Sequence, residues 1–153
     1  MKILRTIGEA QKLTTSLRLK NKTIGFVPTM GYLHDGHLSL VKAARKKADI
    51  VIVSIYVNPL QFAPTEDLSK YPRDFKRDES ICRKAGVDYI FYPDDKQMYP
   101  DKYSTYVTVE NITNRLEGRI RPEHFKGVAT IVLKLFNIVQ PHFSVFGQKD
   151  AQQ

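Results

Sequence analysis

The sequence predicts one α/β domain over residues 1–153, built on a parallel sheet flanked by helices. Residues 49–57 and 22–28 are apolar runs rich in β-branched side chains, which is typical of strands covered on both faces. Amphipathic segments of helical period alternate with these runs, and this alternation favours a parallel sheet with right-handed crossover connections. A chain of 153 residues, 42% of them hydrophobic, can bury one ordinary core.

The elements follow one another in a regular rhythm. Apolar residues recur at helical spacing over residues 7–17, and this helix precedes the strand at residues 22–28, which ends at a proline. After a turn over residues 29–36, apolar side chains between positions 38 and 48 mark one face of a second helix, and the strand at residues 49–57 follows it.

A further helix and strand repeat this unit. The helix is expected over residues 73–84 with Gly86 as its stop, and residues 87–92 form a strand closed by a proline. Residues 103–109 are a candidate strand, residues 127–138 an apolar helix and residues 143–146 a last short strand.

Composition narrows the function classes. No apolar stretch approaches the roughly 20 residues that span a bilayer, so we expect a cytoplasmic protein without membrane contact. Cys82 is the only cysteine, which excludes an internal disulfide, and it is interpreted as a small helix residue. The net charge of +8 fits both nucleic acid and ATP as partners, and charge alone does not choose between them.

Polar residues gather just after three of the predicted strands. These segments are residues 29–37, 58–61 and 147–153. Ligands of open parallel sheets bind outside the carboxyl ends of the strands. The three segments are therefore the candidate site.

The first segment, P-T-M-G-Y-L-H-D-G-H at residues 28–37, is a strand-to-helix turn with Gly31 and Gly36. Glycines let the backbone approach a phosphate, and the helix that follows offers free N–H groups. His34 and His37 lie one helical turn apart and can point together at that anion. A zinc site with only these two ligands and an ordinary helix cap with incidental histidines are the alternatives.

The other two segments add amides and charges. Asn58 and Gln61 follow the strongest strand and can orient a small polar acid, although capping of the turn is the simpler interpretation. Lys149 can bind phosphate, and Asp150 can hold a magnesium-bound water or an amine.

The H-x-G-H pattern at residues 34–37 resembles the signature of the nucleotidyltransferase superfamily, which implies that the parallel sheet flanked by helices is Rossmann-like. Further motifs in the same order resemble the pantothenate synthetase family over essentially the whole chain. They are V-N-P-L-Q-F at 57–62, Y-P-R at 71–73, M-Y-P at 98–100, R-P-x-H-F-x-G-V at 121–128 and F-G-Q-K-D at 146–150.

The resemblance implies a ligase with two steps on one site. Pantoate attacks the α-phosphorus of ATP to give an adenylate and pyrophosphate, and β-alanine then displaces AMP. His37, His34 and Lys149 are the implied catalytic residues, with Mg²⁺ on the phosphates and Asp150 as its implied protein ligand. The implied ATP contacts are Met30, Gly31, Tyr32, Leu33, His34, Asp35, Gly36, His37, Gly147, Gln148, Lys149 and Asp150.

The resemblance also implies that Gln61, Gln153, Asn58 and Tyr71 bind pantoate and β-alanine. It implies a homodimer that binds small molecules and no nucleic acid. Two further matching residues, Arg121 and His124, have a structural role or lie at the subunit interface.

Two features depart from the family pattern. Ala151 stands where an aromatic residue is common. Family members also continue into a second domain that closes over ATP, so we expect weak nucleotide binding and little turnover from this chain alone.

Two rival functions remain open. One is another H-x-G-H enzyme that adenylates phosphopantetheine or a mononucleotide. The other is a nucleic-acid-binding module, which the absence of helix-turn-helix and RNP patterns disfavours.

Overall fold

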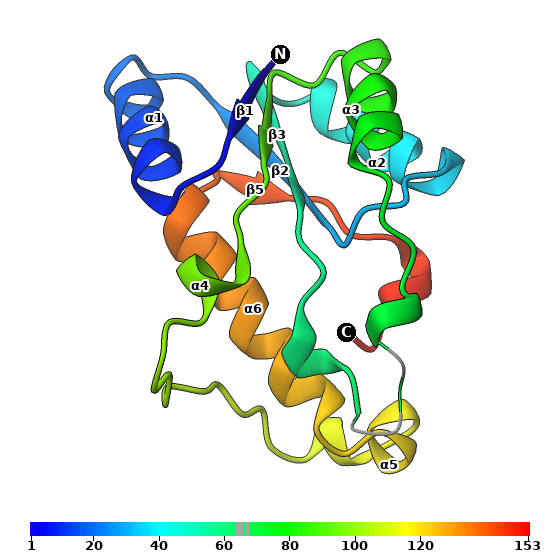
Figure 1. Ribbon diagram of the computed structural model, residues 1–153. Helices are drawn as coiled ribbons and strands as arrows, with labels where there is room; N and C mark the ends of the chain where they lie inside the picture. Colours follow the sequence, from blue (N-terminus) through cyan, green and yellow to red (C-terminus); the bar gives the residue numbers. More distant parts are fainter. Residues whose placement is uncertain (64–65, 67) are drawn as a thin grey trace.

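Five parallel strands form the sheet, in the order β1-β4-β3-β2-β5 (Figure 1). The structure is a computed structural model that describes residues 1–63, 66 and 68–153. The central pair, β2 and β3, is in register from Ile24 opposite Ile50 to Thr29 opposite Ile55. The strands are β1 (Lys2–Leu4), β2 (Ile24–Thr29), β3 (Ile50–Ile55), β4 (Tyr89–Phe91) and β5 (Phe143–Ser144). The predicted parallel sheet is confirmed.

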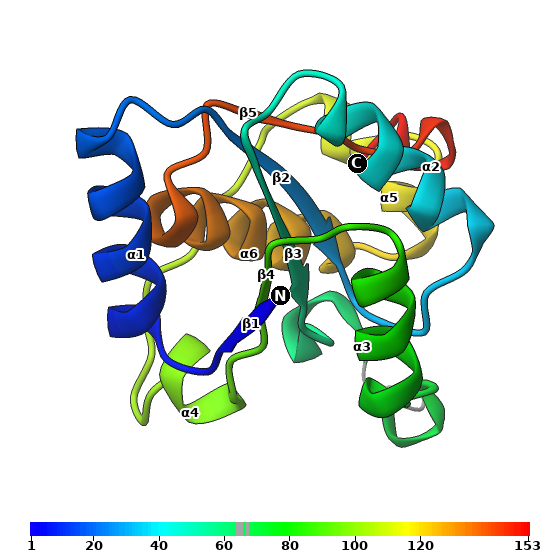
Figure 2. The ribbon, with the colours of Figure 1, turned by 90° about the horizontal axis from the view of Figure 1, so that it is seen from above.

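Helices cover both faces of this sheet (Figure 2). One face carries α1 (Ile7–Leu19) and α6 (His124–Val139), and the other carries α2 (Asp35–Arg45) and α3 (Phe75–Lys84). Shorter turns connect them: α4 (Asp95–Met98), α5 (Glu117–Ile120) and the 3₁₀ turns η1 (Pro59–Gln61), η2 (Leu68–Lys70), η3 (Ile112–Asn114) and η4 (Gln148–Asp150). Among the described residues, no helix is long and apolar enough to cross a membrane.

The central strand β3 shows why both faces are apolar. Ile52 packs with Phe26 and the α1 and α6 side chains, whereas Val51 and Val53 pack with α2 and α3. Successive side chains of a strand point to opposite faces, so a strand between two helical layers is apolar at most positions, and Ser54 is the polar residue in β3. The prediction of a parallel strand covered on both faces at residues 49–57 is confirmed.

Cys82 lies within α3, as predicted, and is 1% exposed. Burial raises the pKa of its thiol to about 12, which leaves it protonated at neutral pH. The interpretation of Cys82 as a small helix residue is confirmed.

Two elements differ from the sequence prediction. Residues 103–109 form no strand, because this segment packs along α6: the N–H of Val107 donates to Thr130 Oγ1 at 3.0 Å, and Lys134 Nζ lies 4.2 Å from the ring centre of Tyr103. The short edge strand β1, which pairs with β4, was not predicted. Three residues are too few to show a period.

The strand order places the candidate segments side by side. β2 lies between β3 and β5, and all three run in the same direction. The segments at residues 29–37, 58–61 and 147–153 consequently leave neighbouring strands at one edge of the sheet. The chain runs from β2 to β3 and β4 and returns to β5 on the other side of β2, so this edge is also a topological switch point.

Candidate functional site

A cleft of about 570 Å³ opens at the carboxyl ends of β2, β3 and β5. Its floor includes apolar side chains of α6 such as Val128 and Ile131. Two predicted residues, Leu33 and Asp35, do not line it, and Leu33 is 2% exposed in the core between the sheet, α2 and α3. The predicted residues that line it are Met30, Gly31, Tyr32, His34, Gly36, His37, Asn58, Gln61, Tyr71, Gly147, Gln148, Lys149, Asp150 and Gln153.

Both histidines of the turn are anchored through the same ring nitrogen. His34 Nδ1 accepts the N–H of Gly36 at 3.1 Å, and His37 Nδ1 accepts the N–H of His34 at 3.3 Å. A neutral imidazole that accepts at Nδ1 carries its hydrogen on Nε2. With the ring centres 4.2 Å apart, the two side chains form a pair of Nε2–H donors at the start of α2.

His37 is the less exposed of the pair. Burial lowers the pKa of His37 below its usual value, and the neighbouring His34 and Lys149 act in the same direction. His37 is therefore a neutral donor in the free chain at pH 7. Lys149 and Asp150 line the same cleft as His37, so the third segment lies near the first.

The backbone of residues 31–33 is engaged within the protein. The N–H of Gly31 donates to Thr29 Oγ1 at 3.2 Å, and the N–H groups of Tyr32 and Leu33 donate to Asp78 at 2.7 Å each. A buried carboxylate therefore already occupies the amides of Tyr32 and Leu33. Contact of residues 31–33 with ATP stays a prediction. The groups that this turn leaves for a ligand are the Nε2–H groups of the two imidazoles.

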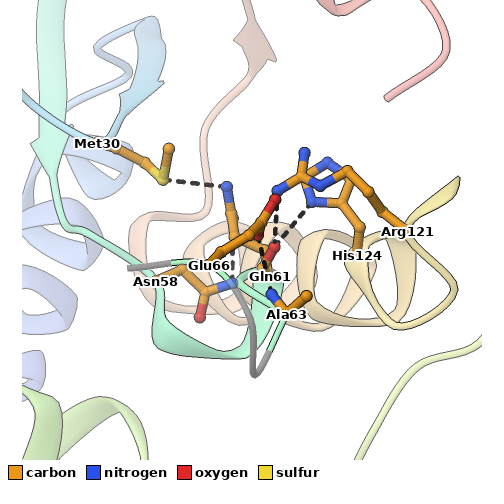
Figure 3. A network of polar contacts seen from close by, with 7 residues as sticks. All are labelled: Met30, Asn58, Gln61, Ala63, Glu66, Arg121 and His124. Carbon is orange, nitrogen blue, oxygen red and sulfur yellow. Dashed lines mark hydrogen bonds and ion pairs between the residues drawn. The ribbon is translucent and has the colours of Figure 1, made fainter. Parts of the chain in front are cut away.

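The amide turn after β3 is built from a chain of oriented hydrogen bonds (Figure 3). Asn58 is 1% exposed; its Nδ2 donates to Gly127 O and to Gln61 Oε1, both at 3.1 Å, and its Oδ1 accepts from the hydroxyl of Tyr99 at 2.7 Å. A backbone carbonyl only accepts, so Gly127 fixes the orientation of Asn58 and Asn58 fixes that of Gln61. Contact of Asn58 with a substrate stays a prediction.

Gln61 consequently presents its Nε2 to the cleft. Its one protein partner among the described residues is Met30 Sδ at 3.0 Å, and a thioether sulfur is a weak acceptor. This leaves a buried N–H donor that a carboxylate or hydroxyl oxygen would satisfy far better.

The backbone of Gln61 is held from the other side by two residues of the R-P-x-H motif (Figure 3). His124 Nδ1 lies 2.9 Å from Gln61 O and must carry the hydrogen, and Arg121 Nη2 donates to the same carbonyl at 3.3 Å. Arg121 also pairs with Glu66 at 2.9 Å. Within this chain, Arg121 and His124 support the amide turn, and the interface role stays untested.

The third segment brings charge to the cleft. Lys149 Nζ donates to Asp150 Oδ1 at 2.7 Å, and the Lys149 side chain is 68% exposed. Such an ammonium can exchange this carboxylate for a phosphate at little cost. Ala151 is exposed and lies outside the lining of the cleft.

Sequence reasoning missed three supporting residues. Asp78 and Tyr99 lie far along the chain from the turns that they hold. No motif includes Asp78, and the M-Y-P motif that contains Tyr99 does not indicate which turn it holds. Gly127 carried a signal: a Cβ at this position would lie 2.3 Å from Leu60 O, so α6 touches the amide turn only because this helical residue is glycine.

The family model described as pantoate-beta-alanine ligase matches residues 2–153. The chain belongs to the pantoate-β-alanine ligase family. The chain is 59% identical to a pantothenate synthetase of Thermotoga petrophila and 58% identical to one of Chloroherpeton thalassium, in both cases over all 153 of its residues. These alignments cover 55% and 54% of those proteins, so the chain spans about half the length of the curated relatives it matches.

Solved structures of the family share the fold. The crystal structure of pantothenate synthetase from Thermus thermophilus superposes with a TM-score of 0.92 at 48% identity, covering 99% of this chain and 54% of that one. A Francisella tularensis pantoate-β-alanine ligase, crystallised with "beta-gamma ATP" and β-alanine, gives a TM-score of 0.95 at 44% identity, covering 100% of this chain and 59% of that one. The family resemblance and the Rossmann-like fold are confirmed.

Proposed function

We propose that this chain carries the ATP and pantoate sites of a ligase that joins pantoate to β-alanine through a pantoyl adenylate, with release of pyrophosphate and AMP. One observation carries the proposal: a single cleft gathers two Nε2–H imidazoles, an exposed lysine and an oriented amide donor from three neighbouring strand ends. The family membership and the ATP and β-alanine complex of the Francisella relative support it.

In the first step, the pantoate carboxylate attacks the α-phosphorus and pyrophosphate leaves. His34 and His37 would donate from Nε2 to phosphate oxygens on which negative charge grows, and Lys149 would neutralise the leaving group. Because both rings are already anchored at Nδ1, they need not reorient when that charge develops.

Pantoate would lie on the amide side of the cleft. Gln61 Nε2 would donate to its carboxylate or to a hydroxyl, and Gln153 and Tyr71 line the same space. The apolar floor formed by Val128 and Ile131 suits the hydrocarbon part of a branched hydroxy acid. Neutral amides orient the acid without adding a nucleophile that would consume the adenylate.

In the second step, the β-alanine amine attacks the acyl carbon of the adenylate, the amide bond forms and AMP leaves. Asp150 lies at the cleft and can hold the ammonium group before it loses its proton. The imidazoles that served the first step would now stabilise the departing phosphate.

The residues present fit a magnesium ion that arrives with the nucleotide. Among the described residues, no group of three or more His, Cys, Asp or Glu side chains could hold a metal. Mg²⁺ is commonly bound by substrate phosphates, waters and only one or two carboxylates, and Asp150 supplies one. The ion would neutralise the phosphates for attack.

We also propose that the working form is a homodimer. Ile112, Leu116 and Ile120 are 60%, 74% and 76% exposed on neighbouring turns around η3 and α5. Apolar side chains gathered in this way mark an interaction surface. Analytical ultracentrifugation tests this, and a monomer at micromolar concentration would contradict it.

Isothermal titration calorimetry with ATP, Mg²⁺ and pantoate tests the site. His37→Ala should weaken ATP binding about tenfold, the worth of one hydrogen bond to a charged group, whereas Gln61→Ala should chiefly weaken pantoate binding. Gln11→Ala, an exposed substitution on α1, is the matched control and should change neither.

Product analysis separates the rival enzymes. Pyrophosphate release should depend on pantoate. Release that depends instead on phosphopantetheine or a mononucleotide would assign another H-x-G-H activity. A gel shift of RNA at physiological salt would favour the nucleic-acid interpretation.

A further inference from the structure

The turn that carries the histidines is held from outside the cleft by helix α3. Asp78 is 1% exposed, and its two carboxylate oxygens accept different backbone amides, Oδ2 from Tyr32 and Oδ1 from Leu33, both at 2.7 Å. The two segments are 46 and 45 residues apart in the chain. A buried carboxylate thus ties one crossover helix to the loop of another strand.

This turn needs such support because its backbone is unusual. Gly31 has φ +85° and Tyr32 has φ +50°, so two consecutive residues adopt the left-handed region. That conformation is unfavourable for a tyrosine and persists only where its surroundings impose it. Successive amides in such a turn form a concavity that binds anions, and here the protein's own carboxylate fills it.

Arg77, the neighbour of Asp78 on α3, holds the other side of the turn. Its guanidinium carbon lies 5.0 Å from the ring centre of Tyr32, and its Nη1 lies 3.6 Å from Asp78 Oδ1. A Cβ on Gly31 would approach Asp78 Oδ2 to 3.0 Å. The carboxylate, the left-handed glycine and the tyrosine are therefore packed as one unit.

The unit leads directly into the histidines. Leu33 follows Tyr32, is buried in the core and is bonded to Asp78, and the next amide, that of His34, donates to His37 Nδ1. The direction in which the chain enters α2 decides whether this bond and the bond from Gly36 to His34 form. Those two bonds keep both Nε2–H groups available to a ligand.

We propose that Asp78 is a positioning residue for the adenylation site: by holding the amides of Tyr32 and Leu33, it sets the Nε2–H form and the direction of His34 and His37 without touching the nucleotide. This inference rests on the proposed function only for its effect on ATP. Its effect on the histidine rings stands independently.

Two substitutions separate geometry from charge. Asp78→Asn keeps the shape but replaces one acceptor oxygen with a donor that opposes an N–H, and Asp78→Glu keeps the charge but shifts the carboxylate by one methylene. Glu79→Gln is the matched control, since Glu79 lies on the same helix and pairs with Arg83. The ¹⁵N shifts of the two imidazoles report which nitrogen is protonated, and circular dichroism reports folding.

Positioning predicts that both Asp78 variants mix the Nδ1–H and Nε2–H forms at His34 and His37. It also predicts about tenfold weaker binding of ATP with Mg²⁺, while Glu79→Gln matches the parent chain. A loss of charge alone would change Asp78→Asn and leave Asp78→Glu like the parent, which would overturn the proposal. Unchanged tautomers in both variants would also overturn it.

Gly31→Ala repeats the test without altering α3, because the added Cβ forces the turn away from Asp78. It decides the question if the Asp78 variants do not fold, and intact Nε2–H forms in Gly31→Ala would count against the proposal. If the tautomers shift while the parent chain binds no ATP, the positioning role holds and the proposed function fails.

Discussion

The cleft has two sides that are built in opposite ways. On the histidine side, His34 is exposed, each ring has one backbone anchor, and the support comes from the distant carboxylate of Asp78. On the amide side, Asn58 and Gln61 are 1% and 7% exposed, and both polar side-chain atoms of Asn58 are bonded within the protein.

The difference reflects the ligands that each side is proposed to meet. A polyphosphate brings several charges and stays partly hydrated, so donors near solvent serve it well. A small hydroxy acid offers few groups, so a donor for it must be oriented beforehand and its neighbours satisfied. Substitutions on the amide side should therefore cost stability, whereas those on the histidine side should cost binding.

The largest loss of stability is expected from a substitution at the contact between α6 and the amide turn. Replacement of glycine by alanine inside a helix normally stabilises by about 1 kcal/mol. In Gly127→Ala, however, the new Cβ would lie 2.3 Å from Leu60 O and 2.6 Å from Gln61 N. Since all these atoms are backbone, we expect a loss of about 2–4 kcal/mol, measured by urea denaturation.

Gly8→Ala is the matched control, because this helical glycine in α1 has open space around the new Cβ. It should stabilise the fold by up to about 1 kcal/mol. Equal effects of the two substitutions would show that α6 does not define the amide turn.

The next effect concerns the buried asparagine. Asn58→Ala removes the partners of Gly127 O, Gln61 Oε1 and the hydroxyl of Tyr99 at once. Buried polar groups left without partners cost about 1–3 kcal/mol, so we expect a loss of at least about 2 kcal/mol together with weaker pantoate binding. Asn137→Ala, on the exposed surface of α6, should change stability by less than about 0.5 kcal/mol. A stable Asn58→Ala that still binds pantoate would indicate that Gln61 is oriented by other means.

The sequence predicted what depends on local pattern. Apolar runs located the central strands, and the position of polar segments after strands located the cleft, because parallel strands share one carboxyl edge. The strand expected at residues 103–109 failed because Thr130 and the lysines of α6 offered that segment partners other than a strand. The β-strand propensity of a segment does not take such long-range partners into account.

The residues that hold the site in place could not be predicted from local sequence patterns, because they too act through long-range contacts. His34, His37 and Gln61 belong to short motifs, but Asp78 and Tyr99 act across the fold. No motif indicates that a distant carboxylate takes the amides of Tyr32 and Leu33, which only the structure shows. Which donors remain for a ligand therefore depends on tertiary hydrogen bonds.

The smallest expected effect is the uptake of protons when ATP binds, which should involve the histidine side of the cleft and not the amide side. Burial keeps the pKa of His37 below its ordinary value of 6.5, so the free chain leaves it neutral where an unfolded chain would bind a proton. His37 therefore contributes less to stability as pH falls below about 6.5. Bound phosphate favours the charged ring and raises its pKa, so ATP should bind with uptake of a fraction of a proton near pH 6 and almost none at pH 8.

Calorimetry in two buffers of different ionisation enthalpy measures this uptake. His37→Gln, which keeps a donor but does not titrate, should reduce it, whereas Gln61→Ala should leave it unchanged because the amide side does not ionise. An uptake near pH 6 that is as large in His37→Gln as in the parent chain would mean that His37 does not meet the phosphates. The histidine side would then owe its affinity to His34 and Lys149.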